Sequence, residues 1–164
     1  MTAYYMERLP DSVLDIVISG YTPGLSQDGD GVEERELIDS LMLESIPMMV
    51  ERGNMVIYHE GNIVYMLRRK TAWVAQVDIF IGEEGTLLEA ISVGRKAIKW
   101  AAENTLFHKI EARSPMPAMK VLAKRLGFDI EGKRKESFKT TDGEMVDEIE
   151  AGLVLRSQSC LKSH

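Results

Sequence analysis

Apolar positions recur along this chain with two periods, one typical of strands and one typical of helices. Residues 54–58, 63–69 and 72–81 are rich in β-branched and aromatic side chains, and the short polar segment 59–62 separates the first two runs. Such runs predict strands, because branched and aromatic side chains pack well on a pleated surface. We expect the three segments to form an antiparallel meander.

The segment 86–104 predicts the best-defined helix. Thr86 and Glu89 have the spacing of a capping box, in which each side chain bonds the other residue's backbone N–H. Apolar and small residues then recur on one face, at Leu87, Ala90, Ile91, Gly94, Ala97, Ile98 and Ala101. The small side chains on this face would let the helix lie close to a sheet.

The last third of the chain predicts a strand, a helix and a hairpin, over residues 109–113, 117–126, 133–140 and 145–155. Gly127 directly follows the helix, where glycine is common because it adopts a positive φ without strain. Asp142-Gly143 between the last two strands is a turn dipeptide for the same reason. We expect strands 72–81 and 109–113 to be parallel neighbours, joined by helix 86–104 in a right-handed crossover.

The first third is less regular. Residues 3–8 predict a short strand, and a helix follows that starts near Pro10 and ends near Gly20. The Gly-, Ser- and Asp-rich stretch 22–31 predicts a loop. A second helix begins near residue 32, and we expect Pro47 to end or kink it, because proline cannot donate a helical hydrogen bond.

The predicted order of elements is β-α-α-β-β-β-α-β-α-β-β, which defines an α+β fold class. A chain of 164 residues suits one domain, over residues 1–156, followed by a polar tail at 157–164. The net charge of -6 argues against general nucleic-acid binding, which needs a positive surface. No apolar run approaches the roughly 18 residues of a membrane helix, so we expect a cytoplasmic protein.

The residues that favour metal binding or disulfides are too few or too scattered to form a site. Cys160 is the only cysteine, so no internal disulfide can form. Residues 27–31 superficially resemble a calcium loop, but Val32 and Asp39 stand where that pattern needs other ligands. The three histidines are far apart in the sequence. We expect no metal site.

Residues 107–152 carry a resemblance to a known family. The runs His108-Lys109-Ile110-Glu111-Ala112-Arg113, Val121-Leu122-Ala123-Lys124-Arg125-Leu126-Gly127-Phe128 and Glu131-Gly132 resemble the GNAT acyltransferase superfamily, especially its ribosomal-protein-acetylating branch. Asp142-Gly143 and Asp147 resemble the end of the same pattern. The resemblance covers roughly residues 54–155. It implies a three-layer fold with a central mixed sheet, in which strands 72–81 and 109–113 splay apart to admit acetyl-CoA.

The resemblance also assigns a cofactor site. In this superfamily, amides at the start of the helix after the splayed strand hold the CoA diphosphate, since a helix N-terminus presents free N–H groups and partial positive charge. The corresponding positions here are Ile81, Gly85, Thr86 and Leu87. The loop itself, Gly82-Glu83-Glu84-Gly85-Thr86, departs from the family's Gln/Arg-x-x-Gly-x-Gly/Ala pattern. Its two glutamates favour the helix N-terminus electrostatically but oppose a polyanion.

The catalytic positions that the resemblance implies are altered as well. Gln76 takes the place of the strand glutamate that serves as general base, and Asp78 is the nearest carboxylate on the same face. Ala123 replaces the tyrosine that protonates the thiolate, and Met116 replaces the motif asparagine. Ser114 and Tyr65 are candidate substitutes. Asp78 also has a purely structural interpretation, as a paired or exposed carboxylate.

Two hypotheses about function follow. The altered motifs favour a GNAT-fold protein that has weak or lost acetyl transfer and serves in binding or assembly with a protein partner. The chain resembles, in this respect, divergent GNAT-like proteins of bacteriophages, some of them associated with virion assembly. The alternative is an active N-acetyltransferase that uses acetyl-CoA, with Asp78 or a water molecule as base. The oligomeric state and the acceptor are open.

Overall fold

The protein, described here from a computed structural model, is built on one seven-stranded mixed sheet. The structure describes residues 2–4, 13, 15–16, 45–140 and 142–155. Within them the strand order is β1-β2-β3-β4-β5-β7-β6. The strands are β1 (Thr2–Tyr4), β2 (Met55–Glu60), β3 (Ile63–Arg69), β4 (Val74–Ile81), β5 (Lys109–Ser114), β6 (Asp129–Lys139) and β7 (Met145–Val154), and the helices are α3 (Leu87–Asn104) and α4 (Pro117–Arg125).

Strands β2, β3 and β4 form the predicted antiparallel meander. Tyr58 pairs with Tyr65 across β2 and β3, and Tyr65 pairs with Ile79 across β3 and β4. Gly61 makes the β2–β3 turn with φ of 57°, a conformation that glycine adopts without strain. Residues 63–67 are all buried, because both faces of the sheet are covered here.

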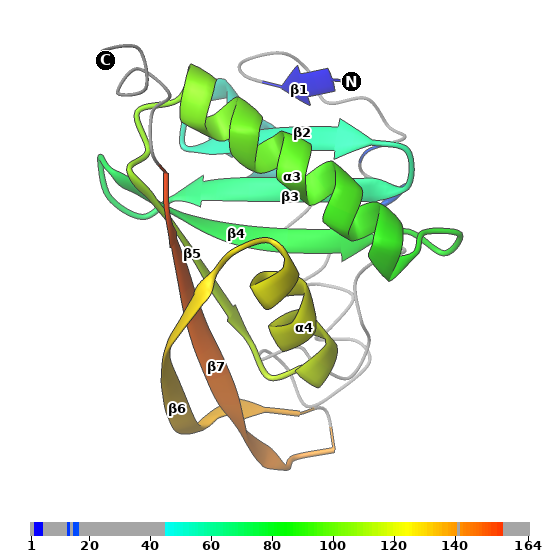
Figure 1. Cartoon of the computed structure of the whole chain (residues 1–164), viewed down its shortest axis with the longest axis vertical. Helices are drawn as coiled ribbons and strands as arrows, with labels where there is room; N and C mark the ends of the chain where they lie inside the picture. Colours follow the sequence, from blue (N-terminus) through cyan, green and yellow to red (C-terminus); the bar gives the residue numbers. More distant parts are fainter. Residues whose placement is uncertain (1, 5–12, 14, 17–44, 141, 156–164) are drawn as a thin grey trace, which may run out of the picture.

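Helix α3 begins at the predicted capping box. The Thr86 side chain accepts a hydrogen bond from the Glu89 N–H at 3.2 Å, and the Glu89 carboxylate accepts one from the Thr86 N–H at 2.8 Å. The helix covers one face of β2, β3 and β4, as Figure 1 shows. A side chain at Gly94 would collide with Tyr65 and Leu126, so the close approach requires glycine.

Two apolar cores lie on opposite faces of the sheet. One joins α3 and α4 to the sheet through residues such as Tyr65, Ala97 and Leu122. The other joins helical residues 13, 15–16 and 45–51 to the opposite face, through residues such as Val50 and Met66. Helix, sheet and helix therefore make three layers. This confirms the predicted α+β, three-layer fold.

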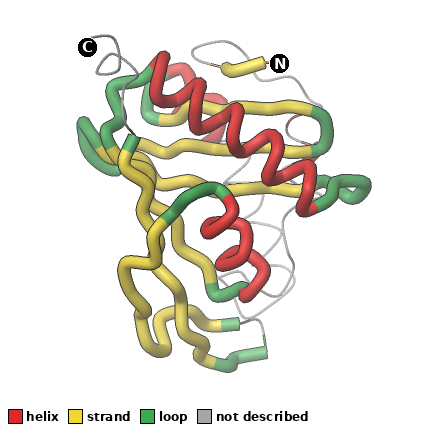
Figure 2. The backbone as a smooth tube through the Cα atoms, in the orientation of Figure 1, coloured by secondary structure: helices red, strands yellow, loops and turns green. Residues whose placement is uncertain are grey.

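The sheet divides between β4 and β5. These strands are parallel, as predicted, and are joined through α3. Their register holds for three residue pairs, Val74 with Lys109, Ala75 with Ile110 and Gln76 with Glu111, and then ends. Figures 1 and 2 show β5, β7 and β6 turning away from β4 below α3, with α4 on the near face.

Several boundaries differ from the predicted ones. Residues 45–51 are helical, and the Arg52 N–H bonds the Met48 carbonyl at 3.1 Å, so Pro47 does not end the helix. Strand β6 begins at Asp129 rather than at 133, with register shifts between Ile130 and Gly132 and between Arg134 and Phe138. The predicted loop at 22–31 and the tail at 157–164 lie outside the described residues.

Candidate functional site

A cleft of about 550 Å³ occupies the place where β4 and β5 separate. It lies between α4 and the sheet on one face and reaches residues 45–49 on the other. Five of the ten methionines line it: Met49, Met55, Met66, Met116 and Met119. Methionine is flexible and polarizable, so a cleft lined by it can adapt to irregular apolar shapes. The volume falls in the range of ordinary ligand pockets.

The main charged pair in this cleft is Arg68 on β3 with Asp78 on β4. The Arg68 Nε donates a 2.6 Å hydrogen bond to the Asp78 Oδ2, and the two side chains are 41% and 32% exposed. Met66 is the direct cross-strand partner of Asp78, so Arg68 reaches it diagonally. Asp78 is therefore a paired carboxylate, as its structural interpretation predicts.

The other three catalytic candidates differ in whether they line the cleft and in what their side chains bond. Ser114 lines the cleft with Asp78, but its Oγ accepts a 3.0 Å hydrogen bond from the Met116 N–H. Gln76 lies at the last pair before the splay and is not part of the cleft lining among the described residues. Tyr65 lines the cleft, yet its hydroxyl is buried and donates to the Ala90 carbonyl at 2.5 Å.

Burial raises the pKa of the Tyr65 hydroxyl well above its ordinary value of 10.0. A hydroxyl that holds its proton this tightly, and that already donates it to a carbonyl, is a poor proton donor for a leaving thiolate. On α4, Ala123 and Met116 both line the cleft and carry no proton to give. The described part of the cleft therefore offers no obvious general acid.

The four predicted cofactor residues lie together, where β4 leads into α3. Ile81 ends β4, Thr86 is the N-cap of α3, and Leu87 is its first residue. A Cβ on Gly85 would lie 2.7 Å from the Ile81 side chain, which explains the glycine. None of the four lines the cleft at the splay.

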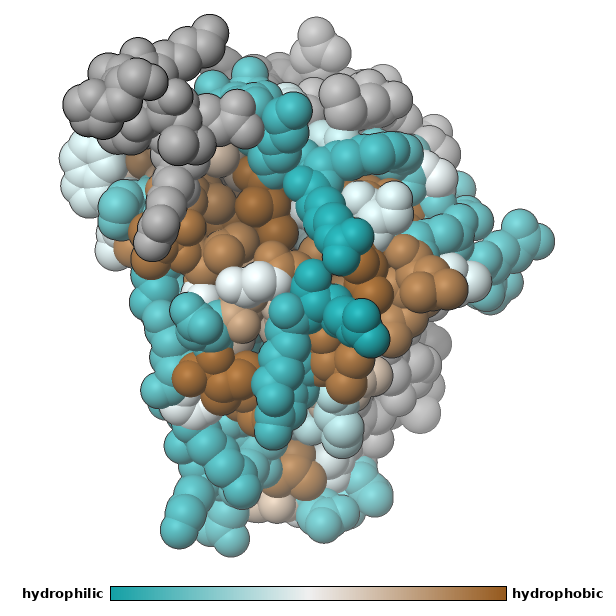
Figure 3. Space-filling view, in the orientation of Figure 1, coloured by the Kyte–Doolittle hydropathy of each residue, from teal (hydrophilic) through white to brown (hydrophobic). Residues whose placement is uncertain are grey.

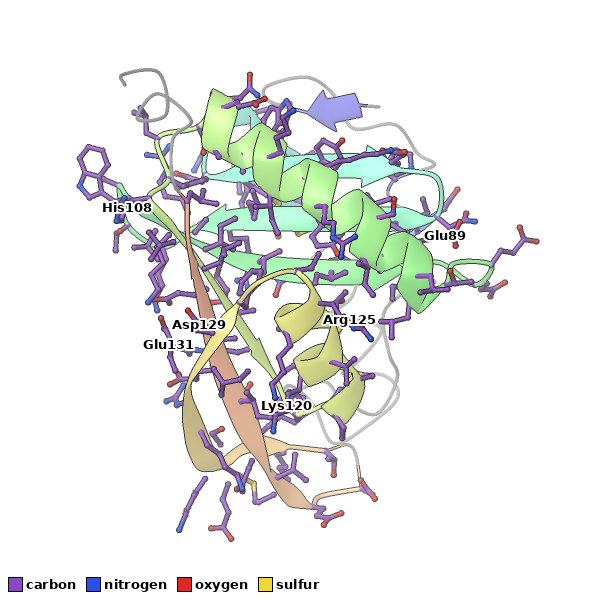
Figure 4. All side chains as sticks on the ribbon, viewed as in Figure 1. Glu89, His108, Lys120, Arg125, Asp129 and Glu131 are labelled. Carbon is purple, nitrogen blue, oxygen red and sulfur yellow. The ribbon has the colours of Figure 1, made fainter. Side chains whose placement is uncertain are left out.

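Carboxylates crowd this helix N-terminus. Glu83 and Glu84 are exposed in the preceding turn, and Figure 4 shows Glu89 at the same end of α3. The Glu89 carboxylate already accepts from the Thr86 N–H at 2.8 Å and from its hydroxyl at 3.2 Å. One of the amide donors that an anion would use is thus occupied by the protein's own side chain.

The residues that carry the family resemblance form an ion-pair network on the sheet. Lys109 bonds Glu131 of β6 at 2.8 Å, and Lys70 bonds Glu111 at 2.5 Å. Gly152 of β7 allows this arrangement, because a side chain there would collide with the Glu131 carboxylate. Lys70 holds the pKa of Glu111 below its ordinary range by hydrogen bonding. These motif residues stabilise strand pairing at the base of the splay.

Sequence reasoning missed Arg68 and Lys120 as cleft residues. Arg68 could have been found from the register of the β3–β4 hairpin, which places it diagonally to Asp78. Lys120 lines the cleft from α4 and forms no ion pair with the rest of the described chain. Lys120 could not be singled out from the sequence, because a single lysine on a helix is ordinarily exposed to solvent.

The structure offers no alternative metal chemistry in the ranges that it describes. No group of three or more His, Cys, Asp or Glu side chains is close enough there to hold a metal ion. None of the helices in those ranges is long and apolar enough to span a membrane.

Known structures with a similar fold include N-acetyltransferases. A chimera built on the spermidine N-acetyltransferase of Vibrio cholerae superposes with a TM-score of 0.68 at 15% identity, covering 94% of this chain and 96% of its own. A putative acetyltransferase from Acinetobacter baylyi gives 0.61 at 15% identity, covering 76% and 75%. An N-acetyltransferase from Staphylococcus aureus gives 0.56 at 16% identity, covering 84% and 80%.

Sequence comparison adds no closer relationship, since no protein-family model and no curated protein matches the chain. At these identities the likeness establishes the fold. The chain has the fold of the GNAT N-acetyltransferases, with the splayed β4 and β5 strands in the expected place.

Proposed function

We propose that this protein is a GNAT-fold binding protein in which acetyl transfer is weak or lost, and that its cleft serves a partner other than acetyl-CoA. The acidic N-terminus of α3 carries the proposal. Glu83, Glu84 and Glu89 lie at the start of α3, where the family resemblance implies that the diphosphate of CoA would approach. Anions bind helix N-termini through free amides and partial positive charge, and carboxylates oppose both.

The electrostatic repulsion between these carboxylates and a phosphate group is large enough to weaken acetyl-CoA binding measurably. One carboxylate at roughly 6 Å from a phosphate charge, at an effective dielectric of ~40, costs on the order of 1.4 kcal/mol, or tenfold in affinity. A second carboxylate at a similar distance doubles the penalty. We therefore expect a dissociation constant for acetyl-CoA of about 0.1 mM or weaker.

The cleft chemistry supports the same proposal. Asp78 is committed to Arg68, the Tyr65 hydroxyl to a backbone carbonyl, and Ala123 has no proton to give. General acid–base catalysis contributes about 10²–10⁴-fold to a reaction. A site that lacks a free acid and a free base loses much of that contribution.

The exposed surface supports a binding role. Trp73 is 61% exposed and Leu106 is 78% exposed. They lie on adjacent loops, because the Trp73 carbonyl accepts hydrogen bonds from the N–H groups of His108 and Lys109. Large exposed apolar side chains that gather in one place favour protein contacts. We propose an assembly component, of the kind that the resemblance to bacteriophage proteins suggests.

Calorimetry with acetyl-CoA in modest salt tests the proposal. The wild-type protein should bind weakly, and Glu83→Gln with Glu84→Arg should tighten binding at least tenfold. Asp129→Asn with Glu144→Arg is the matched control, since it makes the same charge change at exposed positions on β6 and in the β6–β7 turn. Micromolar binding by the unmodified protein would overturn the proposal.

A second candidate function is an active acetyl-CoA-dependent N-acetyltransferase. The specific observation in its favour is that the cleft is retained, with Asp78 and Ser114 both in its lining. The spermidine N-acetyltransferase of Vibrio cholerae, which has the same fold at a TM-score of 0.59 and 16% identity, has been crystallised with CoA and spermine. Release of free thiol from acetyl-CoA, with polyamine and peptide amine acceptors, tests this candidate.

A further inference from the structure

The charged side chains that line the cleft are divided unevenly between the two faces of the sheet. They are Arg68, Asp78, Arg113 and Lys120. On β4, Val77 belongs to the core beneath α3 and α4, so strand alternation turns Asp78 and its partner Arg68 to the opposite face. On β5, Ile110 belongs to that same core, so Arg113, three residues further on, also faces away from α4. Among the described lining residues, Lys120 is therefore the one charged group in the α4 half of the cleft.

Lys120 also differs from the other two cations in having no carboxylate partner. The Arg68 Nε bonds the Asp78 Oδ2 at 2.6 Å, and the Arg113 Nε lies 3.1 Å from the Glu150 Oε1. Lys120 forms no ion pair with any residue in the described ranges. The α4 half of the cleft thus carries one uncompensated positive charge, which favours an anionic ligand over a cationic one.

Ser114 supplies a second hydrogen-bond donor in the same half. It lies where β5 leads into α4, six residues before Lys120. Its Oγ accepts a 3.0 Å hydrogen bond from the Met116 N–H, and the hydroxyl proton finds no acceptor among the described residues. The first turn of α4 contains no acidic residue. An ammonium and a hydroxyl can both donate to a carboxylate, which accepts through two oxygens.

The remainder of the α4 half is apolar. Its lining includes Met116, Met119, Ala123 and Leu126 from α4 and the residue that follows it. Figure 3 shows apolar surface beside charged side chains on the face that carries α3 and α4. Methionine side chains adapt to irregular apolar shapes, and the cleft volume of about 550 Å³ suits a small molecule. A ligand that fits has an apolar body and one anionic group.

We propose that the α4 half of the cleft binds a small apolar carboxylic acid, with its carboxylate at Lys120 and Ser114 and its apolar body among the methionines. This inference rests on the proposed function, because it requires that the cleft be free of acetyl-CoA. It names the ligand chemistry of that site. Such a ligand has no diphosphate, so it does not meet Glu83 and Glu84, which lie outside the cleft lining.

Three probes with the same apolar chain and different head groups test the inference. Octanoate, octanol and octylamine are titrated into the protein by calorimetry at neutral pH and low salt. We expect octanoate to bind at least tenfold more tightly than octylamine, and added salt to weaken octanoate but not octanol. Equal or tighter binding of octylamine, or no binding of octanoate at millimolar concentration, overturns the inference.

A pair of lysine substitutions on α4 tests the position of the carboxylate. Lys120→Met should weaken octanoate at least fivefold and leave octanol unchanged, because the apolar part of the site is kept. Lys124→Met is the matched control, since Lys124 is an exposed lysine on the same helix and lies outside the cleft lining. Methionine and lysine have similar helix propensities, so both variants should fold. Equal loss of octanoate affinity in the two variants contradicts the inference.

Methionine methyl resonances locate the apolar body. Octanoate should shift the signals of Met116 and Met119, which line the cleft, and leave those of Met48 and Met145, which do not. Shifts confined to Met48 or Met145 overturn the inference.

Acetyl-CoA binding separates failure of this inference from failure of the proposed function. Micromolar acetyl-CoA binding overturns the proposed function, whatever the octanoate titrations give. Weak acetyl-CoA binding without a preference for octanoate over octylamine overturns the carboxylate site alone.

Discussion

The hydroxyl of Tyr65 donates a 2.5 Å hydrogen bond to the carbonyl oxygen of Ala90, and so joins the middle of the sheet to the first turn of α3. Helix and strand can approach this closely because Gly94, one turn further on, has no side chain. The contact positions the N-terminus of α3, and with it the acidic loop at residues 82–86. It also removes Tyr65 from proton transfer.

Gly94→Ala should destabilise the protein. A Cβ there would lie 2.8 Å from the Leu126 side chain and closer still to the Tyr65 hydroxyl, both of them buried. Overpacking a core costs typically 1–3 kcal/mol, while alanine regains about 1 kcal/mol of helix propensity. We expect a net loss of about 1–2 kcal/mol in urea unfolding. Ser92→Ala, at an exposed position two residues earlier, is the control and should be neutral or stabilising.

Tyr65→Phe should change how stability depends on alkaline pH. The folded-state pKa of Tyr65 is raised above its ordinary value of 10.0, so its contribution is complete below that pH and declines as pH rises toward the folded-state pKa. The variant lacks this decline. We expect the stability difference between wild type and variant to shrink as pH rises above about 10. A difference that stays constant over that range would contradict the burial of a titrating hydroxyl.

The substitution Glu89→Gln tests the negative charge of this side chain separately from its role in capping α3. Glutamine at this position can still accept from the Thr86 N–H, so the capping box is retained. Thermal stability should therefore change little, within about 0.5 kcal/mol. Acetyl-CoA binding should tighten severalfold if the cofactor binds at the start of α3, because one carboxylate is removed there. Glu89→Ala, which also loses the cap, should cost about 1 kcal/mol of stability.

Asp78→Asn tests the role of the cleft carboxylate. Both partners of its ion pair are about a third or more exposed, so the loss in stability should stay within about 1 kcal/mol. If thiol-release assays detect acetyl transfer and Asp78 accepts the proton, turnover should fall about 10²–10⁴-fold. Unchanged turnover would remove Asp78 from the mechanism. Glu144→Gln, an exposed carboxylate near the β6–β7 turn, is the control.

Local chemistry was enough to predict most elements of the fold. The Thr86–Glu89 capping box and the Asp142-Gly143 turn each depend on neighbours in sequence, and both occur as expected. The parallel pairing of β4 and β5 followed from the helical crossover between the two strands and from the family resemblance. The expected helix end at Pro47 is wrong, because proline lacks an N–H to donate but its fixed φ suits a helix that continues beyond it, while the alternative of a kink stays a prediction.

The site was harder to predict, because it depends on contacts across strands. Asp78 was recognised as the cleft carboxylate, but its commitment to Arg68 depends on the register of two strands. The Tyr65 hydroxyl finds its acceptor in Ala90, which is 25 residues away. The motif residues Lys109 and Glu131, which carried the resemblance, pair with each other across the sheet. A sequence pattern can therefore identify a fold while the residues that form it serve in strand pairing.

The short register between β4 and β5 has a mechanical consequence. Only three residue pairs connect the β1–β4 part of the sheet to the β5–β7 part directly. Each part keeps its own antiparallel hydrogen bonds whatever the angle between them. A small rotation about the line through Gln76 and Glu111 would thus widen or narrow the gap while leaving both halves intact, as in hinge motions of domains. The angle between the two parts of the sheet therefore sets the width of the gap between β4 and β5, and with it the size of the ligand that fits there.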